Sequence, residues 1–144
     1  MRVFISHAWE DKPLALSLAQ WPEFIDPWVD VRKLLGGEKL DPTIITAIED
    51  SHVFIVLISR ISLAKAWVAQ EVNWAMEREA QKDRVFVLPV LIEPGIDFST
   101  CAPPFTPFAG RLFIDASDTS EAGLAKSRAA IGLTLFHWAS DWLE

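Results

Sequence analysis

Residues 53–58 read Val-Phe-Ile-Val-Leu-Ile, six apolar side chains in a row without a polar interruption. A strand with one face in water alternates apolar and polar residues, so this unbroken run predicts a central strand covered on both faces. Sheets that are covered on both faces by helices are mostly parallel. The stretch therefore predicts an α/β fold built on a parallel sheet.

Further apolar runs flank this stretch and alternate with helical patterns, which indicates five parallel strands in one domain over residues 1–144. The other predicted strands are residues 3–5, 27–30, 85–92 and 112–114. Pro89 lies inside one of them, and proline is confined to edges and irregular stretches of a sheet. We therefore expect that stretch to be edge-like or irregular.

Helix starts are predicted from capping residues. Asp11 is expected to cap a short helix with Pro13 in its first turn. Asp118, with Glu121 three residues on, resembles a capping box that begins a last helix.

In residues 63–81 apolar side chains recur at helical spacing, and Trp67, Glu71 and Trp74 lie one turn apart along the edge of the apolar arc. A carboxylate among tryptophans on the side that faces protein loses solvation, so its pKa is expected to be raised. Burying an unpartnered charge is costly, so such a group is rarely kept for stability. The spacing also allows Glu71 to sit at the rim of the arc and reach solvent.

Composition excludes several classes of protein. The net charge of −7 and the pI near 4.9 argue against nucleic-acid binding, which requires a basic stripe. No apolar run approaches the roughly 18 to 20 residues that span a membrane, so no membrane contact is expected. The single cysteine, Cys101, excludes an internal disulfide and indicates a reducing compartment, so a cytoplasmic location is expected.

Motifs for common cofactors and metals are missing from the sequence. It has no G-x-G-x-x-G fingerprint and no phosphate loop, and its three histidines lie far apart, so we expect neither a cofactor nor a metal site. Ligands of parallel sheets bind outside the carboxyl ends of the strands, where residues 6–10, 30–37 and 59–60 converge. A single carboxylate among aromatic rings there suits cleavage of an activated N-glycosidic bond, because it stabilises the oxocarbenium-like sugar.

Several segments also match the boxes of one known family in their order and spacing. They are residues 3–11, in the form common in bacterial members, residues 29–37, residues 47–59, the W-x-x-x-E motif from Trp67 to Glu71, and residues 88–90. Over nearly its whole length the chain thus resembles a Toll/interleukin-1 receptor (TIR) domain. The resemblance implies a flavodoxin-like, three-layer fold with a five-stranded parallel sheet.

Enzymatic members of this family cleave NAD+, their substrate, at the nicotinamide–ribose bond. The resemblance therefore implies the same activity for this chain. Glu71 falls on the catalytic glutamate of the family, and Trp67 falls on the tryptophan beside it that shapes the pocket. Asp30, Lys33 and Gly37 fall on the second strand and the BB loop, which help to form the nucleotide site when subunits associate.

Two residues at the end of the first strand complete the expected substrate-binding set, namely Ser6 and Trp9. Enzymatic relatives present nucleotide-contacting residues in the loop after this strand. Some of them carry basic residues there, whereas this chain has Ala8 and Trp9. A stacking role for Trp9 is our own inference.

The leading interpretation is an NAD+ hydrolase or cyclase that acts in bacterial antiphage defence or immune signalling. It would be activated by self-association with other TIR domains through the BB loop, residues 31–40, under a fused or partner sensor domain. A second interpretation is a non-catalytic TIR adaptor that only binds other TIR domains. A third is a nucleoside deoxyribosyltransferase-like enzyme, which would also use a single glutamate.

Overall fold

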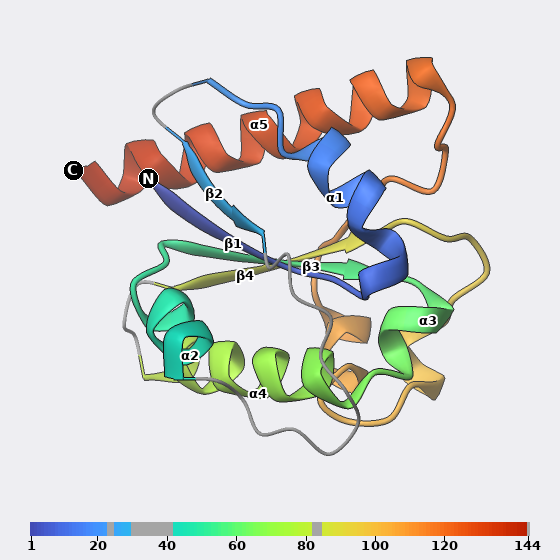
Figure 1. Ribbon diagram of the computed structural model, residues 1–144, viewed down its shortest axis with the longest axis horizontal. Helices are drawn as coiled ribbons and strands as arrows, with labels where there is room; N and C mark the ends of the chain where they lie inside the picture. Colours follow the sequence, from blue (N-terminus) through green and yellow to red (C-terminus); the bar gives the residue numbers. More distant parts are fainter. Residues whose placement is uncertain (23–24, 30–41, 82–84, 144) are drawn as a thin grey trace.

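The computed structural model describes residues 1–22, 25–29, 42–81 and 85–143. Within these residues a sheet of five parallel strands has the order β2-β1-β3-β4-β5 (Figure 1). The strands are β1 (Arg2–Ser6), β2 (Asp26–Val29), β3 (Val53–Ile58), β4 (Phe86–Leu91) and β5 (Ile114–Asp115). This order is that of flavodoxin-like doubly wound folds, so the predicted fold class is confirmed.

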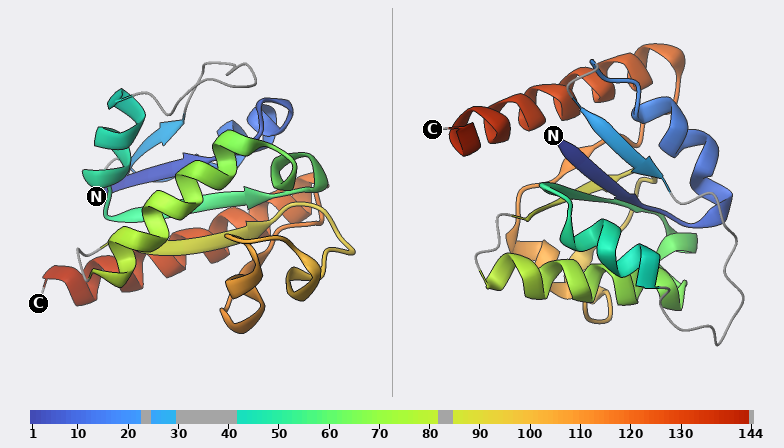
Figure 2. Two further views of the ribbon diagram at one scale, coloured as in Figure 1. Left: turned by 90° about the horizontal axis from the view of Figure 1, so that it is seen from below. Right: turned by 60° about the vertical axis from the view of Figure 1, so that its left-hand side comes forward.

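Helices cover both faces of the sheet, which gives three layers (Figures 1 and 2). α2 (Pro42–Glu49) and α4 (Ala66–Ala80) pack on one face, and α1 (Lys12–Leu18) and α5 (Glu121–Leu143) pack on the other. The connections hold short helices, namely η1 (Trp9–Asp11), α3 (Arg60–Leu63), η2 (Phe98–Thr100) and η3 (Thr106–Gly110). No helix in the described part of the chain is long and apolar enough to cross a membrane.

The two faces divide the side chains of each strand because successive residues point to opposite sides. In β1, Phe4 belongs to the core under α2 and α4, whereas Val3 and Ile5 belong to the core under α1 and α5. All six residues of β3 are buried, which confirms the prediction of a strand covered on both faces.

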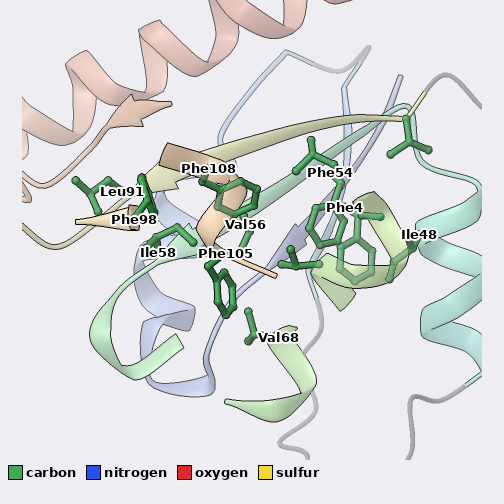
Figure 3. Packing of buried hydrophobic residues seen from close by; sticks show 14 of the residues in the cluster. Phe4, Ile48, Phe54, Val56, Ile58, Val68, Leu91, Phe98, Phe105 and Phe108 are labelled. Atoms are coloured by element: carbon green, nitrogen blue, oxygen red, sulfur yellow. The ribbon is translucent and has the colours of Figure 1, made fainter. Parts of the chain in front are cut away.

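Aromatic rings fill the core between the sheet and α4. Phe4 stacks on Trp28 and Phe54, with ring centroids 5.0 and 5.3 Å apart. Phe98 from η2 and Phe108 from η3 meet edge to face farther along the sheet (Figure 3). These rings belong to one core with the buried residues Val68, Val72 and Ala75 of α4. Their close packing sets the distance between α4 and the sheet.

β4 lies between β3 and β5 and so is not an edge strand as a whole, although at Pro89 it pairs only with β3, as an edge-like stretch does. Phe86 and Ile92 donate backbone hydrogen bonds to carbonyls on the β3 side, so the nitrogen of Pro89 points the other way. There β5 pairs only from Val90 onward. Proline therefore costs no ladder bond at this position.

The helix that carries Glu71 and the last helix begin at other residues than the patterns indicate. Ser120, not Asp118, caps α5, because its Oγ accepts a hydrogen bond from the Gly123 N–H at 3.1 Å. Asp118 instead accepts from the N–H and the hydroxyl of Ser120. Residues 63–81 do not form one helix, since α3 ends at Leu63 and α4 begins at Ala66.

Candidate active site

Glu71 lies in the second turn of α4 and is buried, with 2% of its surface exposed. Val68 and Val72 on the same side of α4 are fully buried against the sheet, and Trp67, one turn before Glu71, is partly buried. The interpretation of Glu71 as a solvent-reaching rim residue is therefore wrong. The side of α4 that faces the sheet is broad enough to include it.

Ser6, the last residue of β1, is a hydrogen-bond partner of Glu71. Its side chain points to the α4 face, like that of Phe4 two residues earlier. The Ser6 hydroxyl donates to Glu71 Oε1 at 2.7 Å, and both side chains are buried. A donated hydrogen bond offsets part of the cost of burying a carboxylate. The pair is thus a polar contact inside an otherwise apolar layer.

Asp11 links the carboxyl ends of two strands instead of capping its own helix. It occupies the N-cap position of α1, yet its side chain makes no capping bond. Its Oδ2 accepts a hydrogen bond from Ser59 Oγ at 2.6 Å, and Ser59 follows β3 and caps α3. Burial raises the pKa of the Asp11 carboxyl, and the bond from Ser59 acts in the opposite direction. The connection after β1 is thereby fixed beside the start of α3.

A second link joins the same connection to α4. Lys65 Nζ lies 3.2 Å from Glu10 Oε1 in η1 and 5.2 Å from the centroid of the Trp67 ring. On the α1 side, Lys12 Nζ lies 4.9 Å from the centroid of the Trp9 ring. Trp9 and Trp67, the two tryptophans of the expected substrate-binding set, therefore each carry a lysine over one face.

His7, one of the three histidines whose spacing argues against a metal site, is a buried polar residue. Its side chain follows Ser6 and is 6% exposed, and Nδ1 lies 2.7 Å from the Ala8 carbonyl oxygen. Nε2 has no hydrogen-bond partner in the described part of the chain. Nothing in the sequence signals this burial. Across the same residues, no cluster of three His, Cys, Asp or Glu side chains is placed to hold a metal ion.

The predicted site residues fall into three groups. Ser6, Trp67 and Glu71 lie together at the side of the sheet where the strands have their carboxyl ends, called here the carboxyl edge. Ser6 and Glu71 are in direct contact. Trp9 lines a groove of about 490 Å³ on α1, together with Pro13 and Leu16 and without Glu71. The remaining predicted positions, Asp30, Lys33, Gly37 and the BB loop at residues 31–40, lie outside the described residues.

A larger cavity, of about 530 Å³, lies at the opposite, amino edge of the sheet. Arg2, Asp26 and Trp28 line it from the strands, and Thr46 and Asp50 line it from the α2 side. Glu71 does not line this cavity either. Neither of these two hollows is lined by Glu71, and the buried carboxylate is the better guide to chemistry because its burial is costly.

Comparisons with known proteins agree with the fold. A family model described as a TIR domain matches residues 3–128. The TIR domains of the activated Roq1 resistosome, which directly recognises the pathogen effector XopQ, match with a TM-score of 0.65 and 19% identity over 93% of this chain and 98% of that chain. The TIR domain of the Toll-related receptor TRR-2 from Hydra magnipapillata matches with a TM-score of 0.61 and 21% identity over 94% of each chain. No curated protein matches the chain.

Proposed function

This chain belongs to the TIR domain family, and we propose that it is an enzyme that cleaves the nicotinamide–ribose bond of NAD+ with Glu71 as its catalytic residue. The observation that carries the proposal is the buried Glu71 carboxylate, which accepts a hydrogen bond from Ser6 at the carboxyl edge of the sheet. Parallel sheets bind ligands at this edge. Trp67, one helical turn away, supplies a flat apolar wall beside the carboxylate.

The chemistry needs only one acidic residue. When the bond between C1′ and the nicotinamide nitrogen breaks, its electron pair neutralises the cationic nicotinamide, so no proton has to be supplied to the leaving group. Positive charge then develops on the sugar, and the ionised Glu71 carboxylate stabilises it. Attack of water on C1′ gives ADP-ribose and a proton, whereas attack by a nitrogen of the same nucleotide gives a cyclic product.

The burial of Glu71 implies a step that opens the site. With 2% of its surface exposed, Glu71 is shielded from a substrate of dinucleotide size. We propose that association with further copies of the domain, through the BB loop at residues 31–40, completes and opens the site. The similar TIR domains from an activated resistosome support a role of assembly in activation. A fused or partner sensor domain would then promote association, in bacterial antiphage defence or immune signalling.

Nicotinamide release from NAD+, measured over a hundredfold range of protein concentration, tests this proposal. We expect the activity to rise more steeply than linearly with wild-type concentration, and Glu71→Gln to abolish it at every concentration. Gly37→Pro should remove the steep rise while the monomer stays folded. Absence of release at all concentrations, or equal release by a folded Glu71→Gln protein, would refute the catalytic assignment.

A non-catalytic TIR adaptor is the second candidate, and the burial of Glu71 is the observation that favours it. In that case Ser6 and Glu71 would only pin α4 to β1. Wild type and Glu71→Gln would then associate equally well in analytical ultracentrifugation, and neither would release nicotinamide.

A further inference from the structure

Lys65 joins the two segments that border the Ser6–Glu71 pair. It immediately precedes α4, and its Nζ contacts Glu10 on η1 while lying over the ring of Trp67. The ammonium is thus held at the carboxyl edge, between the connection that follows β1 and the helix that carries Glu71. In Figure 1 the start of α4 and the beginning of α1 lie toward the same end of the sheet.

The spacing from Glu71 is suited to a nucleotide. Lys65 precedes Glu71 by less than two helical turns, about 9 Å along the axis at a rise of 1.5 Å per residue. In a nicotinamide nucleotide the first phosphate is one ribose away from the bond that is cleaved. A cation at this separation is therefore within reach of the phosphate when the nicotinamide–ribose bond lies at Glu71.

The negative charge of the protein favours a local cation at a site for an anionic substrate. The chain carries a net charge of −7, which repels an anionic substrate unless local cations attract it. Arg60 at the same edge is held by Glu93 at 2.8 Å and by the carbonyls of Pro94 and Gly95. Lys65 contacts Glu10 at 3.2 Å, and the side chains of both residues are partly exposed. The Arg60 guanidinium has two carbonyl partners besides its carboxylate, whereas in the described part of the chain the Lys65 ammonium has the single ion pair with Glu10 and the ring of Trp67, so Lys65 can exchange its partner more readily than Arg60.

From this arrangement we propose that Lys65 recognises a phosphate of the nucleotide substrate, and that Glu10 holds the ammonium until the phosphate displaces it. The inference rests on the proposed function, because it assigns the substrate class of the same site. A lysine binds phosphate as a point charge through charge-assisted hydrogen bonds. The Trp67 ring stays beneath the ammonium in both states and keeps it at the edge.

Steady-state kinetics with two substrates test the proposal. Lys65→Met should raise KM for NAD+ about tenfold, the scale of one charged hydrogen bond, with little change in kcat. Glu10→Gln should lower KM for NAD+ two- to threefold because the competing carboxylate is gone. Neither substitution should change kcat/KM for nicotinamide riboside, which has the same scissile bond and no phosphate, by more than about twofold.

Matched variants separate recognition from folding and from general electrostatics. Lys65 makes no side-chain cap bond to α4, and methionine keeps the apolar contact with Trp67, so Lys65→Met should fold. Lys65→Arg should restore most of the affinity for NAD+. Arg60→Met removes the same charge at the same edge and should leave KM unchanged.

The outcomes distinguish failure of this inference from failure of the proposed function. Lys65 does not bind the phosphate if Lys65→Met leaves KM for NAD+ unchanged, or if it reduces kcat/KM equally for NAD+ and for nicotinamide riboside. The enzyme assignment stands in both cases. Calorimetry of ADP-ribose binding to Glu71→Gln gives a second readout, in which added Lys65→Met should weaken binding about tenfold. A wild-type protein that neither releases nicotinamide nor binds ADP-ribose would overturn the function and this inference together.

Discussion

The amino and carboxyl edges of the sheet differ in how far their charged groups are buried. At the amino edge, Arg2 and Asp50 face each other at 3.7 Å across exposed surface, beside a cavity of about 530 Å³. At the carboxyl edge, Ser6 and Glu71 are buried in contact with each other. Exposed ion pairs contribute little to stability and cost little to keep, whereas a buried carboxylate is costly. The proposed function follows the costly buried group rather than the larger hollow.

The largest expected difference between the edges is in catalysis. Glu71→Gln should reduce nicotinamide release on the order of 100-fold or more, because it removes a charge that acts in the transition state. Asp50→Asn makes the same change of carboxylate to amide at the amino edge and should stay within twofold of wild type. Initial rates of the two purified variants decide the matter. A larger loss for Asp50→Asn would place the active site at the amino-edge cavity.

Two tryptophans offer a second matched pair. Trp67→Ala should lose at least tenfold in activity and about 2 kcal/mol in stability, and Trp67→Phe should retain part of both. Trp28→Ala, which removes the ring stacked on Phe4, should lose a similar amount of stability with normal activity per folded molecule. Urea unfolding and activity assays measure both effects. If Trp67→Ala is unstable but catalytically normal, Trp67 is only a core residue.

Ser6→Ala should reduce activity less than Glu71→Gln and about as much as Trp67→Ala. It leaves Glu71 buried without the hydroxyl, which should lower the free energy of unfolding by about 1–3 kcal/mol. It should also reduce kcat about tenfold by releasing the carboxylate from its position. Unchanged kcat in a folded Ser6→Ala protein would mean that the hydrogen bond serves stability alone.

Local patterns predicted much of the fold and part of the candidate site. The run at residues 53–58 predicts β3 with its observed bounds. Six apolar residues in a row are all removed from water only in a strand that is covered on both faces. Helical spacing placed Glu71 beside Trp67, although it could not decide between rim and interior. The contact with Ser6 joins residues 65 positions apart and depends on how α4 lies on the sheet, so no local pattern contains it.

The missed features depend on neighbouring elements in the same way. Pro89 is tolerated in an internal strand because β5 begins one residue later, which spacing within β4 cannot show. The link between Lys65 and Glu10 exists only once η1 is placed beside α4. The roles of Asp30, Lys33 and Gly37 stay predictions, since they lie outside the described residues.

The smallest expected effect concerns Asp11 and pH. Burial raises the pKa of its carboxyl above the ordinary value of 3.8, so the folded state binds more protons than the unfolded state just above that pH. This group therefore makes stability fall as pH rises through that window. Asp11→Asn keeps an acceptor for Ser59 and lacks this titration, so its stability relative to wild type should be greater at pH 7.5 than at pH 4.5. Urea midpoints at both pH values measure the difference, and a reversed order would mean that the charged bond from Ser59 outweighs burial.

The most direct test of the carboxyl-edge assignment is an NMR titration of the tryptophan indole N–H signals of Glu71→Gln with NAD+, each signal being assigned by a Trp→Phe variant. The titration should use protein concentrations at which the wild type is active. The Trp67 signal should shift until binding saturates, while the signal of Trp28 at the amino-edge cavity stays in place. A saturating shift of Trp28 without a shift of Trp67 would mean that NAD+ binds at the amino-edge cavity instead.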